Sequence, residues 1–224
     1  MIKKIRRLLN RPKWRNLRSI RPVSSVFGLD RGTPIDRVYI EDFLNKYSYL
    51  VTGTTLEIAE NVYTKKYGNN VKSFEILDPS KDNVHATIIG NLTDLNSLPE
   101  NVIDCFICTQ TLNFIYDFKS AIKGIFHVLK DNGTILATVS GISQISRYDM
   151  DRWGDYWRFT TASIDLAFKE VFGKENTQVD YYGNVLSSIA FLEGISAEEL
   201  KIEELFYKDR DYQLIIVIKA KKCK

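Results

Sequence analysis

The sequence is most informative at residues 98–117, which read LPENVIDCFICTQTLNFIYD. Within this stretch, Ile103 to Thr109 is a largely apolar run, typical of a strand buried on both faces of a parallel sheet. Residues 121–129 then show helical spacing, and the turn-forming segment 130–133 ends that helix. Residues 134–139 form a second apolar run. This succession of strand, helix and strand indicates an α/β fold.

The same alternation continues on both sides of this stretch. Apolar runs predict further strands over residues 55–59, 71–77, 86–89, 178–182 and 212–219, and helical spacing predicts helices over residues 38–49, 165–172 and 184–192. A chain of 224 residues without an internal repeat or linker suits one sizeable core rather than two. We therefore expect a basic N-terminal arm, residues 1–22, and a single domain, residues 23–224.

A second informative block, HVLKDNGTILAT, occupies residues 127–138. The two blocks together resemble motifs of the class I S-adenosylmethionine-dependent methyltransferases, in which a leucine–proline pair precedes an aspartate, a strand, a polar pair and a helix, and a valine–leucine–lysine turn leads into the fifth strand. The resemblance covers residues 50–219. It implies a Rossmann-like, seven-stranded, mostly parallel sheet with helices on both faces and an antiparallel last strand. It also implies S-adenosyl-L-methionine as the cofactor.

The resemblance places the cofactor at the ends of the first four strands. Glu57 stands at the acid position of the first motif, but Ala59 and Asn61 replace its usual glycines, which let the backbone adopt positive φ. Their loss predicts either a weakened cofactor site or a wider turn that binds through other groups, Glu60 among them. The other candidates at these strand ends are Glu75 or Asp78 for the ribose hydroxyls, Asn91 and Leu92 for the adenine, and the polar pair Thr109 and Gln110. The competing interpretation is an ordinary turn and polar surface residues.

The segment after the fifth predicted strand, residues 140–160, holds three acids, three arginines and five aromatic residues. Aromatic faces suit sugar rings, and arginines suit phosphate or carboxylate groups. We therefore predict that this segment forms the acceptor pocket. The candidates for a catalytic role are Asp155, Tyr148 and Arg158, with Asp149 or Tyr148 as substitutes for Asp155 as general base. In the structural alternative, Trp153 and Trp157 fill the core and Arg158 forms a salt bridge.

Two short stretches point to a subfamily. DRGTPIDR at residues 30–37 and DYWRF at residues 155–159 are similar to segments of methyltransferases from bacterial surface-polysaccharide clusters. This similarity implies O-methylation of a sugar, or of a phosphate-like substituent, in capsule or O-antigen biosynthesis, with a small-molecule or glycan acceptor. Residues 30–37 would then cap the pocket through Arg31, Asp36 or Arg37. Alternatively, Asp36 is the N-cap of the helix that follows.

The charge is concentrated at the N-terminus. Residues 1–22 contain nine Lys or Arg and no acid, whereas the remainder has 22 basic and 28 acidic residues. Apolar residues at helical spacing in this arm, Ile2, Ile5, Leu8 and Leu9, suit an amphipathic helix that lies on an anionic membrane or docks to a glycan-assembly partner. The competing interpretation is a helix packed on its own domain. We expect no nucleic-acid partner, because the basic pattern does not continue into the domain.

Other functions are less compatible with the sequence. His85 and His127 have no second His or Cys at ligand spacing, so we expect no metal site. Cys105 and Cys108 lie on opposite faces of a predicted strand, which suits core thiols in a reducing cytoplasm. A nicotinamide-dependent oxidoreductase is disfavoured because the G-x-G-x-x-G motif is absent. A catalytically degenerate methyltransferase-fold protein that serves in binding or assembly is the main alternative, supported by the missing glycines.

Overall fold

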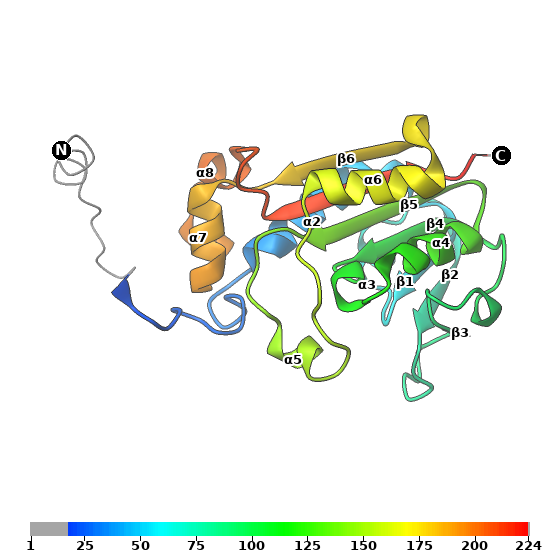
Figure 1. Cartoon of the computed structure of the whole chain (residues 1–224), viewed down its shortest axis with the longest axis horizontal. Coiled ribbons are helices and arrows are strands. Elements are labelled where there is room, and N and C mark those ends of the chain that lie inside the picture. The colour runs from blue at the N-terminus through cyan, green and yellow to red at the C-terminus, as the bar shows by residue number, and fades with distance from the viewer. Residues whose placement is uncertain (1–17, 224) are drawn as a thin grey trace.

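Residues 18–223 of the chain are described by a computed structural model. Within this range seven strands form one sheet in the order β3-β2-β1-β4-β5-β7-β6 (Figure 1). The strands are β1 (Gly53–Ile58), β2 (Val71–Asp78), β3 (Ile88–Ile89), β4 (Ile103–Thr109), β5 (Leu129–Ser140), β6 (Thr177–Tyr182) and β7 (Ile215–Lys221). Strands β1 to β5 pair in parallel, and β7 runs antiparallel between β5 and β6. The predicted sheet with an antiparallel last strand is confirmed.

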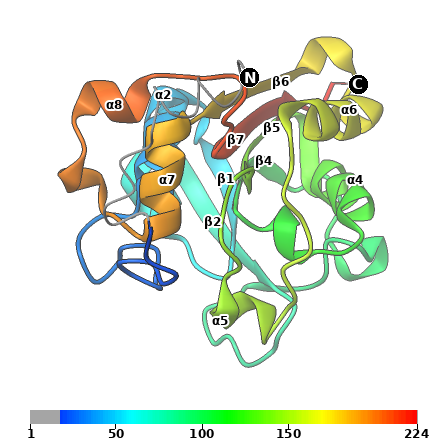
Figure 2. The same ribbon diagram turned by 60° about the vertical axis from the view of Figure 1, so that its left-hand side comes forward.

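Helices cover both faces of the sheet. The α-helices are α2 (Ile35–Lys46), α3 (Val62–Tyr67), α4 (Phe118–Val128), α5 (Arg147–Met150), α6 (Thr161–Phe172), α7 (Val185–Glu193) and α8 (Ile202–Phe206). Short 3₁₀ turns are η2 (Ser48–Leu50), η3 (Leu95–Ser97), η4 (Leu112–Phe114), η5 (Lys174–Asn176) and η6 (Ala197–Glu199). Figure 2 shows α4 and α6 on one side of the sheet and α2, α7 and α8 on the other. The result is a three-layer α/β domain.

The two faces of β4 enter two separate core clusters. Phe106 and Cys108 pack with α4 and α6, whereas Cys105 and Ile107 pack with α2 and α7. Both cysteines are free and fully buried, and burial raises the pKa of each thiol to about 12. The prediction that they point to opposite faces is confirmed, because side chains alternate along a strand.

The structure departs from the predicted boundaries where tertiary contacts outweigh local pattern. The predicted turn at residues 130–133 lies inside β5, where the pairing with β4 is irregular and Asn132 adopts a φ of 70°. The predicted strand 86–89 is reduced to two residues, because it pairs only with β2 at the sheet edge. Helices α3, α5 and α8 were not predicted, since four to six residues show too little periodicity to detect.

The N-terminal arm falls largely outside the described residues. Its four apolar positions, Ile2 to Leu9, lie in the part that the structure does not describe, so the amphipathic-helix prediction is not tested. In residues 18–223, no helix is both long and apolar enough to cross a membrane.

Candidate functional site

A large cavity opens at the carboxyl ends of β1, β2 and β4. The strand order reverses between β1 and β4, and ligands of open α/β sheets bind at such a switch point. The cavity encloses about 1040 Å³, which lies at the upper end of the ~300–1,000 Å³ range of ligand pockets. This volume leaves space for a cofactor and a second small molecule together.

Glu57, near the end of β1, organises the inner wall of this cavity. Its side chain is only 4% exposed and accepts hydrogen bonds from the backbone N–H groups of Tyr63 (3.1 Å) and Thr64 (2.5 Å). These are donors of the first turn of α3 that have no partner inside the helix. Burial raises the pKa of Glu57, and the two bonds partly oppose that shift. Glu57 therefore lines the cavity and also fixes the start of α3.

Ala59 has the backbone conformation of the glycine that it replaces. Its φ is 62°, in the left-handed region, and its N–H donates to the carbonyl oxygen of Leu77 at 3.0 Å. Gln110, after β4, also has a positive φ of 49°. Asn61, at the other glycine position, has an ordinary φ of −121° and precedes α3. The loop therefore keeps the turn that glycine would provide, at a cost of about 1–2 kcal/mol for a residue with a Cβ.

At the end of β2 the structure distinguishes between two candidate acids. Asp78 lines the cavity, and its two oxygens accept one hydrogen bond each, from Ser80 N–H and from the Asn83 amide, both at 2.8 Å. Each oxygen retains a lone pair for a hydroxyl. Glu75 is not among the lining residues, because three positions along a strand reverse the direction of the side chain. The prediction of Glu75 is therefore corrected in favour of Asp78.

The remaining predicted cofactor residues all lie on the cavity wall, namely Ala59, Glu60, Asn91, Leu92, Thr109 and Gln110. Leu92 is 3% exposed, and the Asn91 side-chain oxygen accepts bonds from the N–H and hydroxyl of Thr93. The Gln110 amide turns toward β5, where it donates to the Thr138 hydroxyl and accepts from the Ser140 hydroxyl. Gln110 thus borders the cavity mainly through its backbone.

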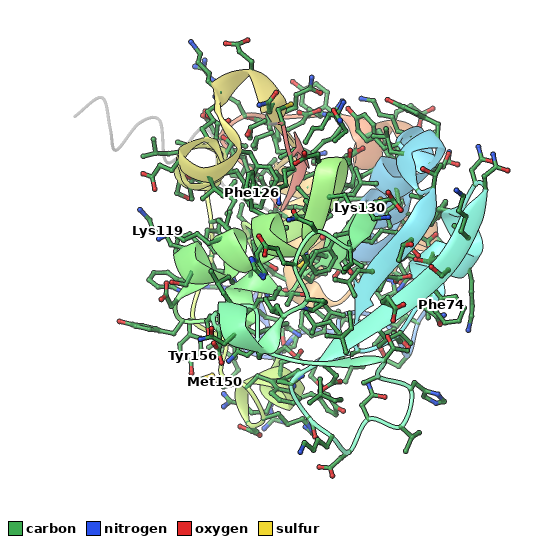
Figure 3. All side chains as sticks on the ribbon, turned by 90° about the vertical axis from the view of Figure 1, so that its right-hand side faces the viewer. Phe74, Lys119, Phe126, Lys130, Met150 and Tyr156 are labelled. Carbon is green, nitrogen blue, oxygen red and sulfur yellow. The ribbon has the colours of Figure 1, made fainter. Side chains whose placement is uncertain are left out.

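The outer part of the cavity is aromatic. Tyr148, Trp153 and Tyr156 from the segment after β5 line it together with Tyr116, and each of the four side chains is at least half exposed. The rings of Tyr116 and Tyr156 meet edge to face at 5.5 Å. Figure 3 shows Tyr156 at one edge of the molecule, beside Met150. Asp149 lines the same region, where one of its oxygens accepts from the Ser146 hydroxyl at 2.5 Å.

Asp155 and Arg158 do not line the cavity, contrary to their predicted catalytic roles. The Asp155 side chain is 1% exposed, and both of its oxygens accept from Arg158, at 2.6 and 2.9 Å. Arg158 also donates to the carbonyl oxygens of Ser143, Gln144 and Trp157. A carboxylate so enclosed has no path to an acceptor, so the pair holds the segment in shape. The predicted alternative of a salt-bridged Arg158 is confirmed, whereas Trp153 is 50% exposed and not a core residue.

Residues 30–37 contribute one side chain to the cavity, Arg37. Arg31 instead pairs with Glu199 at 2.6 Å. Asp36 is the second residue of α2, whose N-cap is Pro34, so the prediction that Asp36 is an N-cap is wrong. Burial raises the pKa of Asp36 to about 6, and the N–H and charge of Arg37 partly oppose the shift.

The cavity wall is predominantly acidic. Five carboxylates line it, Glu57, Glu60, Asp78, Asp117 and Asp149, against a single guanidinium, that of Arg37. Sequence reasoning did not identify Tyr63, Tyr116 and Asp117, because their positions after β1 and β4 become informative only once the strand ends are brought together. Of residues 18–223, no three His, Cys, Asp or Glu are grouped so that they could hold a metal ion.

Residues 49–137, which include β1 to β4 and most of this wall, match a family model described as a methyltransferase domain. This stretch is therefore similar to methyltransferase domains, over less than half of the chain. No curated protein sequence matches the chain.

Solved structures share the fold of this chain. One is a SAM-dependent methyltransferase from Archaeoglobus fulgidus, 12% identical, with a TM-score of 0.53 over 83% of this chain and 94% of that one. Another is the N-methyltransferase NodS from Bradyrhizobium japonicum bound to S-adenosyl-L-homocysteine, 14% identical, with a TM-score of 0.51 over 99% and 97%. The [4+2]-cyclase SpnF is 14% identical, with a TM-score of 0.54 over 92% and 88%. At these identities the similarity establishes the fold and not the reaction.

The cavity fits S-adenosyl-L-methionine, the cofactor that the similarity to methyltransferase domains supports. The acidic wall suits its sulfonium and ammonium charges, and Asp78 can accept from ribose hydroxyls. Leu92, Ile58 and Phe114 offer apolar contacts for the adenine, and Arg37 offers a partner for the carboxylate. The cofactor, when bound, supplies an activated methyl group for in-line displacement.

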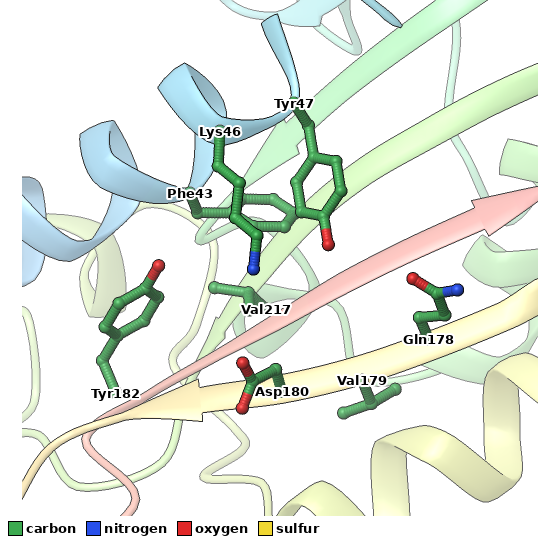
Figure 4. Close-up of a pocket in the computed structure, with 8 residues that line it drawn as sticks. All are labelled: Phe43, Lys46, Tyr47, Gln178, Val179, Asp180, Tyr182 and Val217. Carbon is green, nitrogen blue, oxygen red and sulfur yellow. The ribbon is translucent and has the colours of Figure 1, made fainter. Parts of the chain in front are cut away.

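A smaller pocket of about 200 Å³ lies away from this site, between α2 and the outer strands β6 and β7 (Figure 4). Lys46, the last residue of α2, and Tyr47, which follows it, face Gln178 and Asp180 from β6 across it. None of its lining residues follows a parallel strand end, so it is separate from the large cavity at the ends of β1, β2 and β4.

Proposed function

We propose that this chain transfers a methyl group from S-adenosyl-L-methionine to a hydroxyl group of a sugar in bacterial surface-glycan biosynthesis. The observation that carries the proposal is the aromatic outer cavity with Asp149 on its wall. Aromatic faces pack against the apolar faces of sugar rings, and a carboxylate accepts hydroxyl hydrogen bonds. The capsule or O-antigen context is supported by the sequence similarity of residues 30–37 and 155–159.

The charge of the wall favours a sugar hydroxyl over the phosphate-like acceptor that the sequence left open. The five carboxylates repel a dianionic group, and the single guanidinium is too little to offset them, because a buried anion needs a cation or several donors beside it. With Asp155 enclosed by Arg158, the general base in our proposal is Asp149, and Tyr148 is its substitute. Asp149 takes the hydroxyl proton as the oxygen attacks the methyl carbon.

The alternative of a catalytically degenerate binding or assembly protein loses its main support. That alternative was based on the missing glycines, yet Ala59 keeps the left-handed backbone that a glycine would adopt. The turn at the inner wall is therefore formed, and an acidic cavity of sufficient size lies beside it.

The test is methyl transfer to a panel of neutral sugars, amino sugars and sugar phosphates, followed by mass spectrometry. We expect a product 14 Da heavier from neutral sugars, since one hydrogen is replaced by one methyl group. Asp149→Asn should lower kcat by about 10²-fold or more with an unchanged dissociation constant for S-adenosyl-L-methionine. Asp151→Asn is the matched control, because Asp151 is exposed in the same segment and does not line the cavity. Equal turnover by both variants, or transfer to sugar phosphates alone, would contradict the proposal.

A further inference from the structure

Helix α7 exposes an apolar face to the solvent. Its sequence, VLSSIAFLE, contains one charged residue, the last. Ala190 and Phe191 point into the core, whereas Val185, Leu186, Ile189 and Leu192 are 47%, 44%, 38% and 41% exposed. Positions 185, 189 and 192 follow the helical spacing of one face. The helix is therefore apolar on the side that packs and also on the side that faces outward.

The chain segment before α2 extends this face. Ser24 and Phe27 of this segment pack across the end of α7, where the N–H of Ser24 donates to the carbonyl oxygen of Glu193 at 3.0 Å and the rings of Phe27 and Phe191 lie 5.7 Å apart (Figure 2). Its remaining apolar side chains point outward: Ile20, Val23, Val26 and Leu29 are 98%, 49%, 46% and 57% exposed. We call these four residues, with the four of α7, the α7 surface. Exposed apolar side chains gathered on neighbouring segments are typical of an interaction site.

The basic N-terminal segment directly precedes the residues of this surface in the sequence. Residues 1–22, with nine Lys or Arg and no acid, lead directly into Val23, and Arg18 and Arg21 are exposed beside Ile20. The rest of the chain has an excess of acidic residues. Of the described residues, Arg18 and Arg21 therefore place positive charge next to the apolar side chain of Ile20 in the chain.

We propose that the α7 surface docks on an anionic lipid bilayer, with residues 1–22 contacting the lipid headgroups. The exposed side chains of α7 are aliphatic and stand on a convex helix, a shape that lies in a bilayer interface with its apolar face buried. The basic residues provide the second signal that stable membrane binding requires. A second copy of the chain is a poorer occupant, because a two-fold interface would bring two arms of nine positive charges together.

Docking also orients the candidate active site. The Gln144 amide donates to the carbonyl oxygen of Ser25 at 3.2 Å, which joins the α7 surface to the segment that carries Tyr148 and Asp149. A bound bilayer would therefore lie near the outer cavity. This consequence rests on the proposed function: the acceptor sugar is carried by a membrane lipid, whereas docking itself does not depend on the reaction.

The experiment is flotation of the full-length protein with vesicles of phosphatidylcholine alone, or with about one-third phosphatidylglycerol. We expect binding to the anionic vesicles only, and loss of that binding at high salt. The double substitution Leu186→Asp and Ile189→Asp should weaken binding by at least about 10-fold. The matched control is Leu166→Asp, because Leu166 is 62% exposed on α6, on the other face of the sheet. Leu166→Asp should bind like the unchanged protein.

Three outcomes would overturn the proposal: no flotation with anionic vesicles, equal flotation with both lipid compositions, or equal effects of the α7 and α6 substitutions. Sedimentation that shows a dimer dissociated by Leu186→Asp and Ile189→Asp, without vesicle binding, would assign the surface to a second copy. Far-ultraviolet circular dichroism and S-adenosyl-L-methionine binding confirm that the variants are folded. Methyl transfer to a soluble sugar without vesicles tests the proposed function separately.

Discussion

The two halves of the cavity are built differently. The inner half, after β1 and β2, is held by buried backbone hydrogen bonds to Glu57 and Asp78, which are 4% and 8% exposed. The outer half, after β5, presents aromatic side chains such as Tyr148, which is 66% exposed, on a segment fastened by the Asp155–Arg158 pair. The inner half therefore depends on backbone geometry, and the outer half depends on the identity of its side chains.

This difference explains how the inner half tolerates an altered motif. Ala59 reproduces the left-handed turn although its side chain disfavours it, because the surrounding bonds impose that conformation. In the outer half, by contrast, a substitution of an aromatic residue changes the contact surface itself, because the aromatic rings form that surface. We therefore expect cofactor binding to be robust and acceptor choice to be set by the segment after β5.

The largest effect is expected when the pair that fastens the outer half is broken. Arg158→Ala leaves the buried Asp155 carboxylate without its partner, and should lower the free energy of unfolding by about 3 kcal/mol in urea titrations. The Michaelis constant for the acceptor should rise, while the dissociation constant for S-adenosyl-L-methionine changes by less than about 2-fold. Arg152→Ala is the control, because Arg152 is exposed over the Tyr148 ring, and it should cost less than about 1 kcal/mol. Equal losses in the two variants would remove the distinction between the halves.

A substitution in the inner half should weaken the binding of the cofactor rather than that of the acceptor. Glu57→Gln keeps one acceptor oxygen for two backbone N–H donors, so the free energy of unfolding should fall by about 1–2 kcal/mol. Calorimetry should show weaker binding of S-adenosyl-L-methionine, with little change in the Michaelis constant for the acceptor. Glu60→Gln is the control, since Glu60 is exposed on the same wall and should alter stability by less than about 0.5 kcal/mol. A larger change in the Michaelis constant for the acceptor than in the dissociation constant for the cofactor would contradict the distinction between the two halves.

A third prediction concerns the backbone at Ala59. Ala59→Gly should preserve the free energy of unfolding or raise it by up to about 1 kcal/mol, because glycine adopts a φ of 62° without strain. Ala167→Gly, in the middle of α6, should lower it by about 1 kcal/mol, since glycine disfavours a helix. Urea titration of both variants measures the contrast. If both changes are equally destabilising, the left-handed turn is not a source of strain.

The last prediction is a pH dependence at Asp36, which precedes the cavity residue Arg37 in α2. The pKa of Asp36 is about 6 in the folded protein, against about 3.9 in an unfolded chain. As the pH rises, the unfolded chain therefore releases this proton before the folded protein does. The contribution of Asp36 to the free energy of unfolding decreases as the pH rises from about 4 to 6, and it stays low above pH 6. Asp36→Asn should match the unchanged protein at about pH 4 and exceed it at pH 7 by no more than the about 3 kcal/mol that two pKa units represent. A difference that stays constant with pH would contradict the burial of this carboxyl.

Much of the fold was predictable because its signals are local. The apolar run at residues 103–109 coincides with β4, and the alternation of strands and helices predicted the parallel sheet. The short helix α3 was not predictable, because its first turn is completed by Glu57, which lies outside the helix. At the site, the sequence identified the strand ends but could not choose between Glu75 and Asp78, since that choice depends on which strand face borders the cavity.

By itself, the sequence determined the α/β class, the acid at Glu57 and the segment that forms the outer cavity. Only the tertiary structure decided which acids of that segment reach the cavity. Asp149 and Asp155 are both carboxylates in one loop, but Arg158 encloses Asp155 while Asp149 stays on the wall. The physical reason is that a side chain's chemistry is fixed by its type, whereas its exposure and partners arise from how distant strand ends and their loops pack together.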